Sequence, residues 1–316
     1  MCDLTNPIFH DEDKARAHLE ALRWPNGPVC PHCGSVEGIK RLEGKSHRVG
    51  LHQCNACREH FTVTVGSVME RSHVSLHKWV LAFHLMAASK KGYSAHQLHR
   101  TIGVTYKTAW FMAHRIREAM TVSKPMPLGG EGKIVEADEA YHGKREVPIV
   151  SAQRGDRPYT KRGKSGSAQK RAIVALVERG GEVRADHVKH VTAKNVAEVL
   201  VRHADRKSRL HTDESKLYPT IGAKFAKHET VNHGAKEYAR GDVTTNSVEG
   251  FFGVFKRGFN GIYQHCGEQH FQRYLNEYTF RYNNRIKLGV DDEARAAIAV
   301  RGAEGKRLTY QGARSA

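Results

Sequence analysis

The chain has 316 residues, 39% of them hydrophobic, which is enough for two or three folded units with their own cores. Its formal net charge is +18, from 51 Lys+Arg against 33 Asp+Glu. A surplus this large favours a polyanion such as a nucleic-acid backbone as partner, and a basic surface kept for solubility is the alternative. The sequence predicts neither a signal peptide nor a membrane span, so we expect a cytoplasmic protein without a membrane partner.

Two closely spaced cysteine pairs mark the first expected unit, residues 1–65. Both have the form Cys-x-x-Cys, and twenty residues lie between them. Each such turn supplies two thiolates, and Zn²⁺ takes four ligands at tetrahedral corners, so this spacing predicts a structural zinc site rather than a redox-active pair. The alternating segment Phe61–Val65 predicts a strand, as a zinc ribbon requires. The expected ligands are Cys30, Cys33, Cys54 and Cys57.

Three helices are expected in the second unit, residues 66–124. Ser75, Ser94 and Thr105 can cap them, and Gly103 forms the turn between the last two. A short helix, a glycine turn and a longer helix predict a helix-turn-helix DNA-binding domain. A helical hairpin with a solvated basic face is the alternative. The residues expected to face a DNA groove from the third helix are Lys107, Trp110, His114 and Arg117.

A mixed α/β sheet is expected in the third unit, residues 131–290, followed by a partly ordered C-terminal tail over 291–316. The predicted strands are 134–141, 172–177, 182–188, 210–213 and 230–233, and the predicted helices are 193–203, one from about 245, and 268–285. The whole chain is therefore predicted to be a multidomain α+β protein.

Seven cations against one acid distinguish the Gly/Ser-rich segment 152–171. This composition predicts a loop, and cations at this density suit contact with a phosphate backbone. The residues concerned are Arg154, Arg157, Lys161, Arg162, Lys164, Lys170 and Arg171.

Three acids of the third unit stand out by their location. Asp138 lies within the first predicted strand, Asp213 ends a later strand, and Glu249 starts a long helix. Carboxylates from three separate elements, brought to one point, form the oxygen-rich site that Mg²⁺ prefers. Lys256 follows Glu249 by seven residues and Asn246 precedes it by three, so both lie on its helix face. His211 and His233 lie near strand ends and are further candidates, although 21 histidines weaken that signal.

The segments Val135–Tyr141, His211–Glu214 and Asn246–Phe252, with Lys256, resemble DDE-type transposases of bacterial insertion sequences. More narrowly, they resemble the group with an N-terminal zinc ribbon and a signature of Asp, Asp, Glu and Lys. The resemblance implies an RNase H-like catalytic domain, Mg²⁺ or Mn²⁺ as cofactor, and cutting and joining at terminal inverted repeats. The implied partner is double-stranded DNA, on which we expect a homo-oligomer associated with the nucleoid.

Matched residue by residue, the resemblance assigns metal binding to Asp138, Asp213 and Glu249, and a companion role to Lys256. Asn246 is a rival or a partner to Glu249 as third ligand, because some relatives carry Asn in that part of the signature. Strand alternation places Glu136, rather than Glu139, on the same face as Asp138.

Two other functions are compatible with the same domains. One is a non-catalytic DNA-binding regulator that uses only residues 1–122, against which the intact acids and Lys256 argue. The other is an RNase H-like nuclease that cuts without joining, which a strand-transfer assay distinguishes from a transposase.

Overall fold

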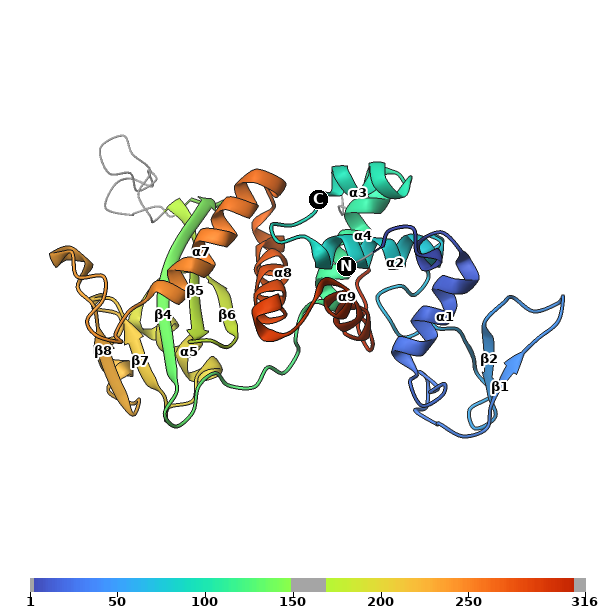
Figure 1. Cartoon of the computed structure of the whole chain (residues 1–316), viewed down its shortest axis with the longest axis horizontal. Helices are drawn as coiled ribbons and strands as arrows, with labels where there is room; N and C mark the ends of the chain where they lie inside the picture. Colours follow the sequence, from blue (N-terminus) through green and yellow to red (C-terminus); the bar gives the residue numbers. More distant parts are fainter. Residues whose placement is uncertain (1–2, 149–168, 310–316) are drawn as a thin grey trace. The chain divides into compact units, whose positions relative to one another are not determined.

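The computed structural model describes residues 3–148 and 169–309, and the chain divides into two compact units (Figure 1). Unit 1 combines Met1–Thr121 with Asn284–Ala316, and unit 2 is Val122–Asn283. Unit 1 is therefore built from two stretches of sequence that lie on either side of unit 2. Among the described ranges, no helix is both long and apolar enough to cross a membrane.

Unit 1 contains a short 3-10 helix (Pro7–Phe9), then α1 (Glu12–Arg23), which Asp11 caps, and a small antiparallel sheet. The sheet has the order β1-β2-β3, with β1 (Ile39–Leu42), β2 (Leu51–Cys54) and β3 (His60–Phe61).

The strand predicted for Phe61–Val65 is wrong beyond Phe61. The backbone there closes on itself in turns, with Val65 N–H donating to Thr62 O at 3.0 Å. The carbonyls of Val63 and Val65 accept from the Arg23 guanidinium, so these groups are satisfied without a partner strand.

Helices form the rest of unit 1: α2 (Leu76–Ala88), α3 (Ala95–Ile102), α4 (Tyr106–Ala119) and α9 (Asp292–Arg301). Ser94 and Gln97 form a capping box at the start of α3. Gly103 ends α3 in the left-handed region at φ 63°, and the Thr105 side chain caps α4. The short helix, glycine turn and longer helix therefore follow in the predicted order.

The first part of the predicted tail over 291–316 forms α9, which belongs to unit 1. Arg295 of α9 donates to the carbonyl of Ala87 at the end of α2, at 3.2 Å. A Cβ at Gly302 would lie 2.4 Å from the carbonyl oxygen of Ala119, so glycine permits the close approach to α4. Composition alone did not reveal this packing.

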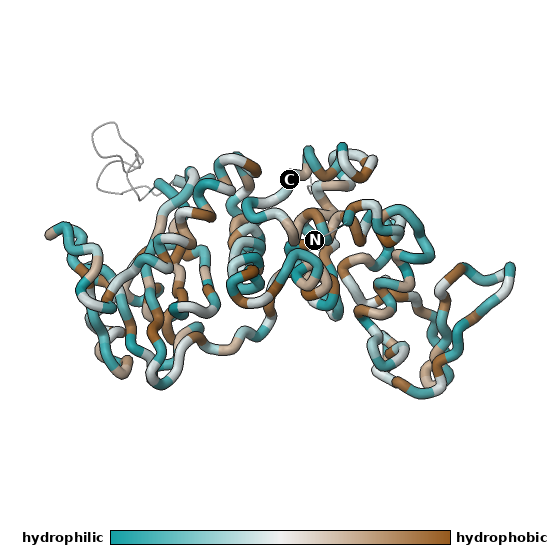
Figure 2. Tube along the Cα trace, in the orientation of Figure 1, coloured by the Kyte–Doolittle hydropathy of each residue, from teal (hydrophilic) through white to brown (hydrophobic). Residues whose placement is uncertain are grey.

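Unit 2 contains a five-stranded mixed sheet with the order β6-β5-β4-β7-β8. Its central strand β4 pairs antiparallel with β5 and parallel with β7, and the outer pairs are β5–β6 (antiparallel) and β7–β8 (parallel). The strands are β4 (Ile134–Lys144), β5 (Lys170–Glu178), β6 (Val183–Val188), β7 (Arg209–Thr212) and β8 (Lys227–Thr230). Hydrophobic residues, drawn in brown in Figure 2, lie in the middle of this sheet.

The strand predicted at 230–233 is displaced, since β8 ends at Thr230. Asn232 accepts a hydrogen bond from Ala235 N–H at 3.0 Å and starts a short helical turn, as Asn often does. His233 therefore lies in a turn beyond the sheet.

Both faces of the sheet are covered. One face packs against α7 (Asn246–Gly258), the π-helical turn Phe259–Tyr263 and α8 (Phe271–Asn283). The other packs against α5 (Ala193–His203) and the short α6 (Pro219–Gly222). Successive residues of β4 alternate between these two cores, so its even-numbered positions face α7.

Candidate functional site

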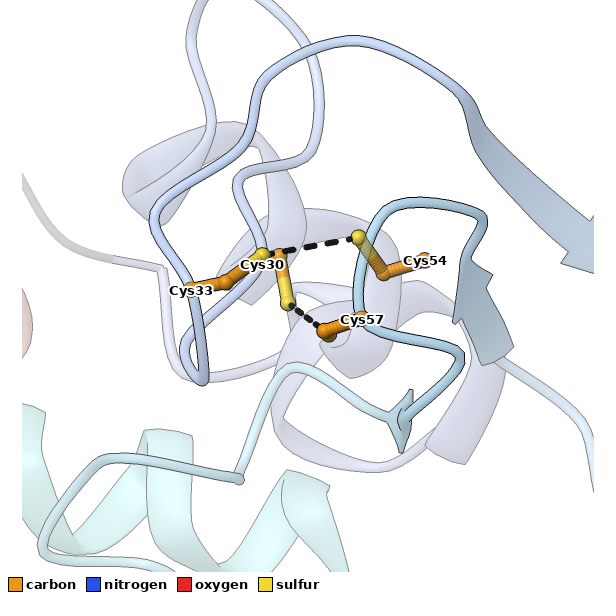
Figure 3. A group of neighbouring side chains, drawn as sticks. All are labelled: Cys30, Cys33, Cys54 and Cys57. Carbon is orange, nitrogen blue, oxygen red and sulfur yellow. Dashed lines mark hydrogen bonds between the residues drawn. The ribbon is translucent and has the colours of Figure 1, made fainter.

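The four predicted cysteine ligands converge on one point of unit 1 (Figure 3). All four Sγ atoms lie within 4.8 Å of one another, with 3.6 Å between Cys30 and Cys57 and 3.7 Å between Cys33 and Cys54. Tetrahedral zinc with Zn–S bonds of about 2.3 Å requires S···S distances of about 3.8 Å. The thiol set therefore fits Zn²⁺ and forms a zinc-binding site.

Each cysteine pair lies on a tight knuckle. Gly34 N–H donates to Cys30 O at 2.9 Å, and Arg58 N–H donates to Cys54 O at 2.8 Å. Gly34 and Arg58 both have left-handed φ, of 76° and 62°. In the second knuckle, the backbone N–H groups of Cys57 and Ala56 lower the pKa of Cys54 to about 7, whereas burial and the neighbouring thiols raise the pKa of Cys57.

The three predicted acids of unit 2 share one electrostatic environment. Asp138 lies on β4, Asp213 directly follows the neighbouring parallel strand β7, and Glu249 lies in the first turn of α7. Burial raises the pKa of Asp138 to about 7, and the negative charges of Glu139, Asp213 and Glu249 act in the same direction. Burial also raises the pKa of Asp213. A cluster of this kind is stabilised by a bound cation.

The acids approach one another less closely than the thiols do. Within the described ranges, only the four cysteines place three or more possible ligand atoms within 4.8 Å of one another. Each carboxylate instead accepts a local hydrogen bond: Asp138 from Glu139 N–H at 2.7 Å, Asp213 from Ser215 N–H at 3.0 Å, and Glu249 from Thr245 Oγ1 at 2.9 Å. Their oxygen donors fit a hard divalent cation.

His233 is the histidine of the two candidates that lies beside an acid of this site. Its Nε2 lies 3.6 Å from Oε1 of Glu249, and its charge opposes the rise in the pKa of Asp213. His211 is buried, and its Nδ1 lies 3.4 Å from the Arg179 guanidinium. The sequence does not distinguish the two histidines, because both lie near the ends of predicted strands.

The remaining candidates lie on α7. Asn246 is the exposed first residue of this helix, and Thr245 occupies the N-cap position. Lys256 is half-buried two turns beyond Glu249, with Nζ 5.8 Å from the centre of the Phe252 ring.

Burial, together with the charges of Arg171 and Lys256, lowers the pKa of His142 to about 4, so this histidine of β4 is neutral.

Comparison with known proteins finds family matches in both units. The ISXO2-like transposase domain matches residues 127–283, and the transposase zinc-ribbon domain matches residues 10–60. A protein in the transposable element ISH50 of Halobacterium salinarum is 31% identical over 257 residues, covering 79% of this chain and 83% of that protein. The chain belongs to the ISXO2-like family of DDE transposases.

Solved structures with a weaker likeness to this transposase are Mos1 complexes. A pre-cleavage Mos1 transpososome has 14% identity and a TM-score of 0.27, covering 67% of this chain and 72% of that one. A Mos1 paired-end complex with the left transposon end has 14% identity and a TM-score of 0.30, covering 71% and 74%. At scores this low, no residue of this chain is matched to a residue of Mos1.

Two residues predicted to face DNA from α4 are buried in this transposase. His114 is 1% exposed and Arg117 is 2% exposed, so the prediction that they face a groove is wrong for this conformation. The reason is that α4 packs against α2, α3 and α9. Lys107 remains exposed and Trp110 is half-buried.

The predicted basic segment divides in a similar way. Arg154, Arg157, Lys161, Arg162 and Lys164 lie outside the described residues. Lys170 is exposed at the start of β5. Arg171 is 2% exposed, donates to the carbonyls of Lys144 and Cys266 at 3.1 Å each, and lies 4.8 Å from the centre of the Phe271 ring. Its predicted contact with DNA is therefore wrong, because its guanidinium is used inside unit 2.

Proposed function

We propose that this transposase cuts DNA at the ends of its element and joins them to target DNA, with unit 2 as an RNase H-like catalytic domain. The observation that carries the proposal is the shared environment of Asp138, Asp213 and Glu249, which come from three different elements. The position of β4 at the centre of a mixed sheet, next to β7, supports this catalytic domain.

In the proposed site, Asp138, Asp213 and Glu249 hold Mg²⁺ or Mn²⁺ through their carboxylate oxygens. The bound ions supply charge that activates the attacking oxygen and stabilises the leaving oxygen. Lys256 extends from the same helix as Glu249 and contacts a phosphate of the cut strand. Asn246 lies one turn before Glu249 and contributes to the same edge, as a partner of the third ligand.

We place the DNA-binding surface of unit 1 at a concave basic surface, because two of the α4 residues predicted to contact DNA are buried. An open pocket of about 530 Å³ lies beside Lys107 on α4 and Lys78 on α2. Its other basic residues are Arg71, His73 and Arg115. Cations gathered in a hollow suit the phosphates of double-stranded DNA, and the exposed Lys170 of the basic segment offers a further phosphate contact.

One assay distinguishes a transposase from the two alternatives, a nuclease that cuts without joining and a non-catalytic DNA-binding regulator. The purified chain is incubated with Mg²⁺, a duplex that carries the inverted repeat flanking its gene, and a target plasmid. We expect cleaved ends and joined products on an oligomeric complex, and no products from the Asp138→Asn variant. Cleavage without joining would identify a nuclease, and binding without cleavage would identify a regulator.

A further inference from the structure

Strand β4 carries two further acids beside Asp138, and each contacts the element that holds one of the other two site acids. We propose that Glu136 and Glu139 are positioning residues: Glu136 fixes Glu249 relative to Asp138, and Glu139 fixes Asp213. The inference rests on the proposed metal site, and it concerns residues that the transposase signature does not include.

Glu136 is fully buried and accepts hydrogen bonds from the start of α7. The backbone N–H groups of Ser247 and Val248 donate to Oε2 at 2.7 and 3.3 Å, and the Ser247 hydroxyl donates to Oε1 at 3.0 Å. A carboxylate at a helix N-terminus satisfies N–H groups that have no partner within the helix, and its charge suits the helix dipole. Glu249 is the next residue, so the turn that carries it is bound to β4.

Arg179 completes the attachment of α7. Its guanidinium donates to Oε1 of Glu136 from Nε at 2.9 Å and from Nη2 at 2.8 Å. The same group donates to the carbonyls of Asp242 at 2.7 Å and Thr244 at 3.3 Å. The loop that leads into α7 is therefore held by the same ion pair as the first turn of the helix.

The distance between Asp138 and Glu249 is controlled through this attachment. Glu136 and Asp138 are two positions apart on one strand and point to the same face of the sheet. A movement of the start of α7 away from Glu136 would move Glu249 away from Asp138 as well. Glutamine at position 136 has one acceptor oxygen instead of two, and its amide would face N–H donors.

Glu139 makes the equivalent contact on the opposite face of β4. The Tyr218 hydroxyl donates to its Oε2 at 2.5 Å, and the Ser215 hydroxyl lies 3.5 Å from its Oε1. Ser215 N–H in turn donates to Asp213, so the loop after β7 is joined to β4 one residue from Asp138. Tyr218 is fully buried in the core between the sheet and α5, which makes this anchor rigid.

The test measures Mn²⁺ binding to the full-length, zinc-loaded chain without DNA. Glu136→Gln and Tyr218→Phe should each weaken Mn²⁺ binding, by about 10–100-fold for Glu136→Gln, as expected when partners of metal ligands are removed. Tyr218→Phe keeps the Glu139 side chain and removes only the hydroxyl that holds it, so a loss reports the contact between Tyr218 and Glu139. Ser247→Ala is a milder variant that should weaken binding less, and it serves if Glu136→Gln does not fold.

The chain offers matched controls in α8 and in the π-helical turn before it. Glu277 is a fully buried glutamate that pairs with Arg281, and the Tyr263 hydroxyl donates to it at 2.5 Å. Glu277→Gln and Tyr263→Phe should lower the unfolding temperature while leaving the Mn²⁺ affinity unchanged. Equal weakening by these controls would show a general loss of structure and overturn the proposal.

Asp138→Asn separates this inference from the proposed function. If Asp138→Asn loses Mn²⁺ binding while Glu136→Gln, Tyr218→Phe and Ser247→Ala retain it, the positioning roles are refuted and the metal site stands. If Asp138→Asn binds Mn²⁺ like the unaltered chain, the metal site itself is wrong, and the positioning roles fail with it.

Discussion

The imidazole of His233 lies beside Glu249, with 3.6 Å between Nε2 and Oε1, and Glu249 also contributes to the raised pKa of Asp138. Asn246, three residues earlier, is exposed, and its backbone N–H donates to Thr244 Oγ1. The electrostatic interaction of Glu249 with Asp138 favours Glu249 over Asn246 as the third ligand of the proposed metal site.

Glu249→Gln should therefore reduce Mg²⁺-dependent cleavage by at least about 100-fold, since loss of a ligand costs more than loss of a partner of a ligand. Asn246→Ala should reduce cleavage by less than about 10-fold. Cleavage rates on an element-end duplex, with unfolding temperatures as a control for folding, measure both. Full cleavage by Glu249→Gln with none by Asn246→Ala would assign the third position to Asn246.

The stability of unit 2 without metal should fall as the pH rises from about 4 to about 7. The pKa of Asp138 is about 7 in the folded chain, whereas an exposed Asp titrates near 3.8, so between these values the folded state binds the additional proton. The proton on Asp138 adds at most about 4 kcal/mol to the free energy of unfolding, and this stabilisation is absent above pH 7.

Thermal unfolding in EDTA at pH 5 and pH 8 tests this dependence. Asp138→Asn should reduce the difference and be more stable than the unaltered chain at pH 8. Some dependence should remain, because burial also raises the pKa of Asp213 and Glu139. An Asp138→Asn variant with the same pH dependence as the unaltered chain would contradict the raised pKa.

Zinc content should follow the four cysteines of the ribbon and no other thiol. Cys54→Ala should remove the stoichiometric zinc and unfold the ribbon, because so small a unit depends on metal for its stability. Cys266→Ala is the matched control, since Cys266 is buried in unit 2 and its carbonyl and Sγ accept hydrogen bonds from Arg171. Metal analysis and circular dichroism measure the outcome, and zinc-free Cys266→Ala protein would be inconsistent with it.

Lys107 and Arg171 should differ in their effects on DNA binding. Lys107→Ala should weaken binding and reduce the slope of log affinity against log salt by roughly 0.9, the value for one lost phosphate contact. Arg171→Ala should lower the unfolding temperature of unit 2 and leave that slope unchanged, because its guanidinium is buried. Titrations of duplex DNA at several salt concentrations distinguish the two, and the opposite order would restore Arg171 to the DNA interface.

Local pattern was sufficient for some of these features. The Cys-x-x-Cys spacing identifies all four thiols of the zinc-binding site, because each knuckle is formed within a few residues. The strand preceding Asp213 and the helix carrying Glu249 follow from short apolar patterns, and the resemblance to transposases supplied their roles. Alternation along β4 also placed Glu136 correctly on the face of Asp138.

Burial that depends on distant segments was not readable from the sequence. The spacing of His114 and Arg117 defines a stripe on α4 but not the number of helices that cover it. Arg171 resembles its charged neighbours in sequence, yet its partner Cys266 is 95 positions away. The proposed role of Glu136 depends on Ser247, which lies 111 positions away in the sequence. The residues around Glu136 give no sign of such a partner.

The packing of α9 on α2 has a consequence for the order of synthesis. The hydrogen bond from Arg295 to the carbonyl of Ala87 joins positions 208 residues apart, and all of unit 2 is translated between them. A nascent chain therefore carries the ribbon and α2 to α4 without the helix that completes their core. Products of premature termination would expose the apolar face of α2 to proteases and chaperones, so unit 1 becomes complete only in chains that already contain the acids of unit 2.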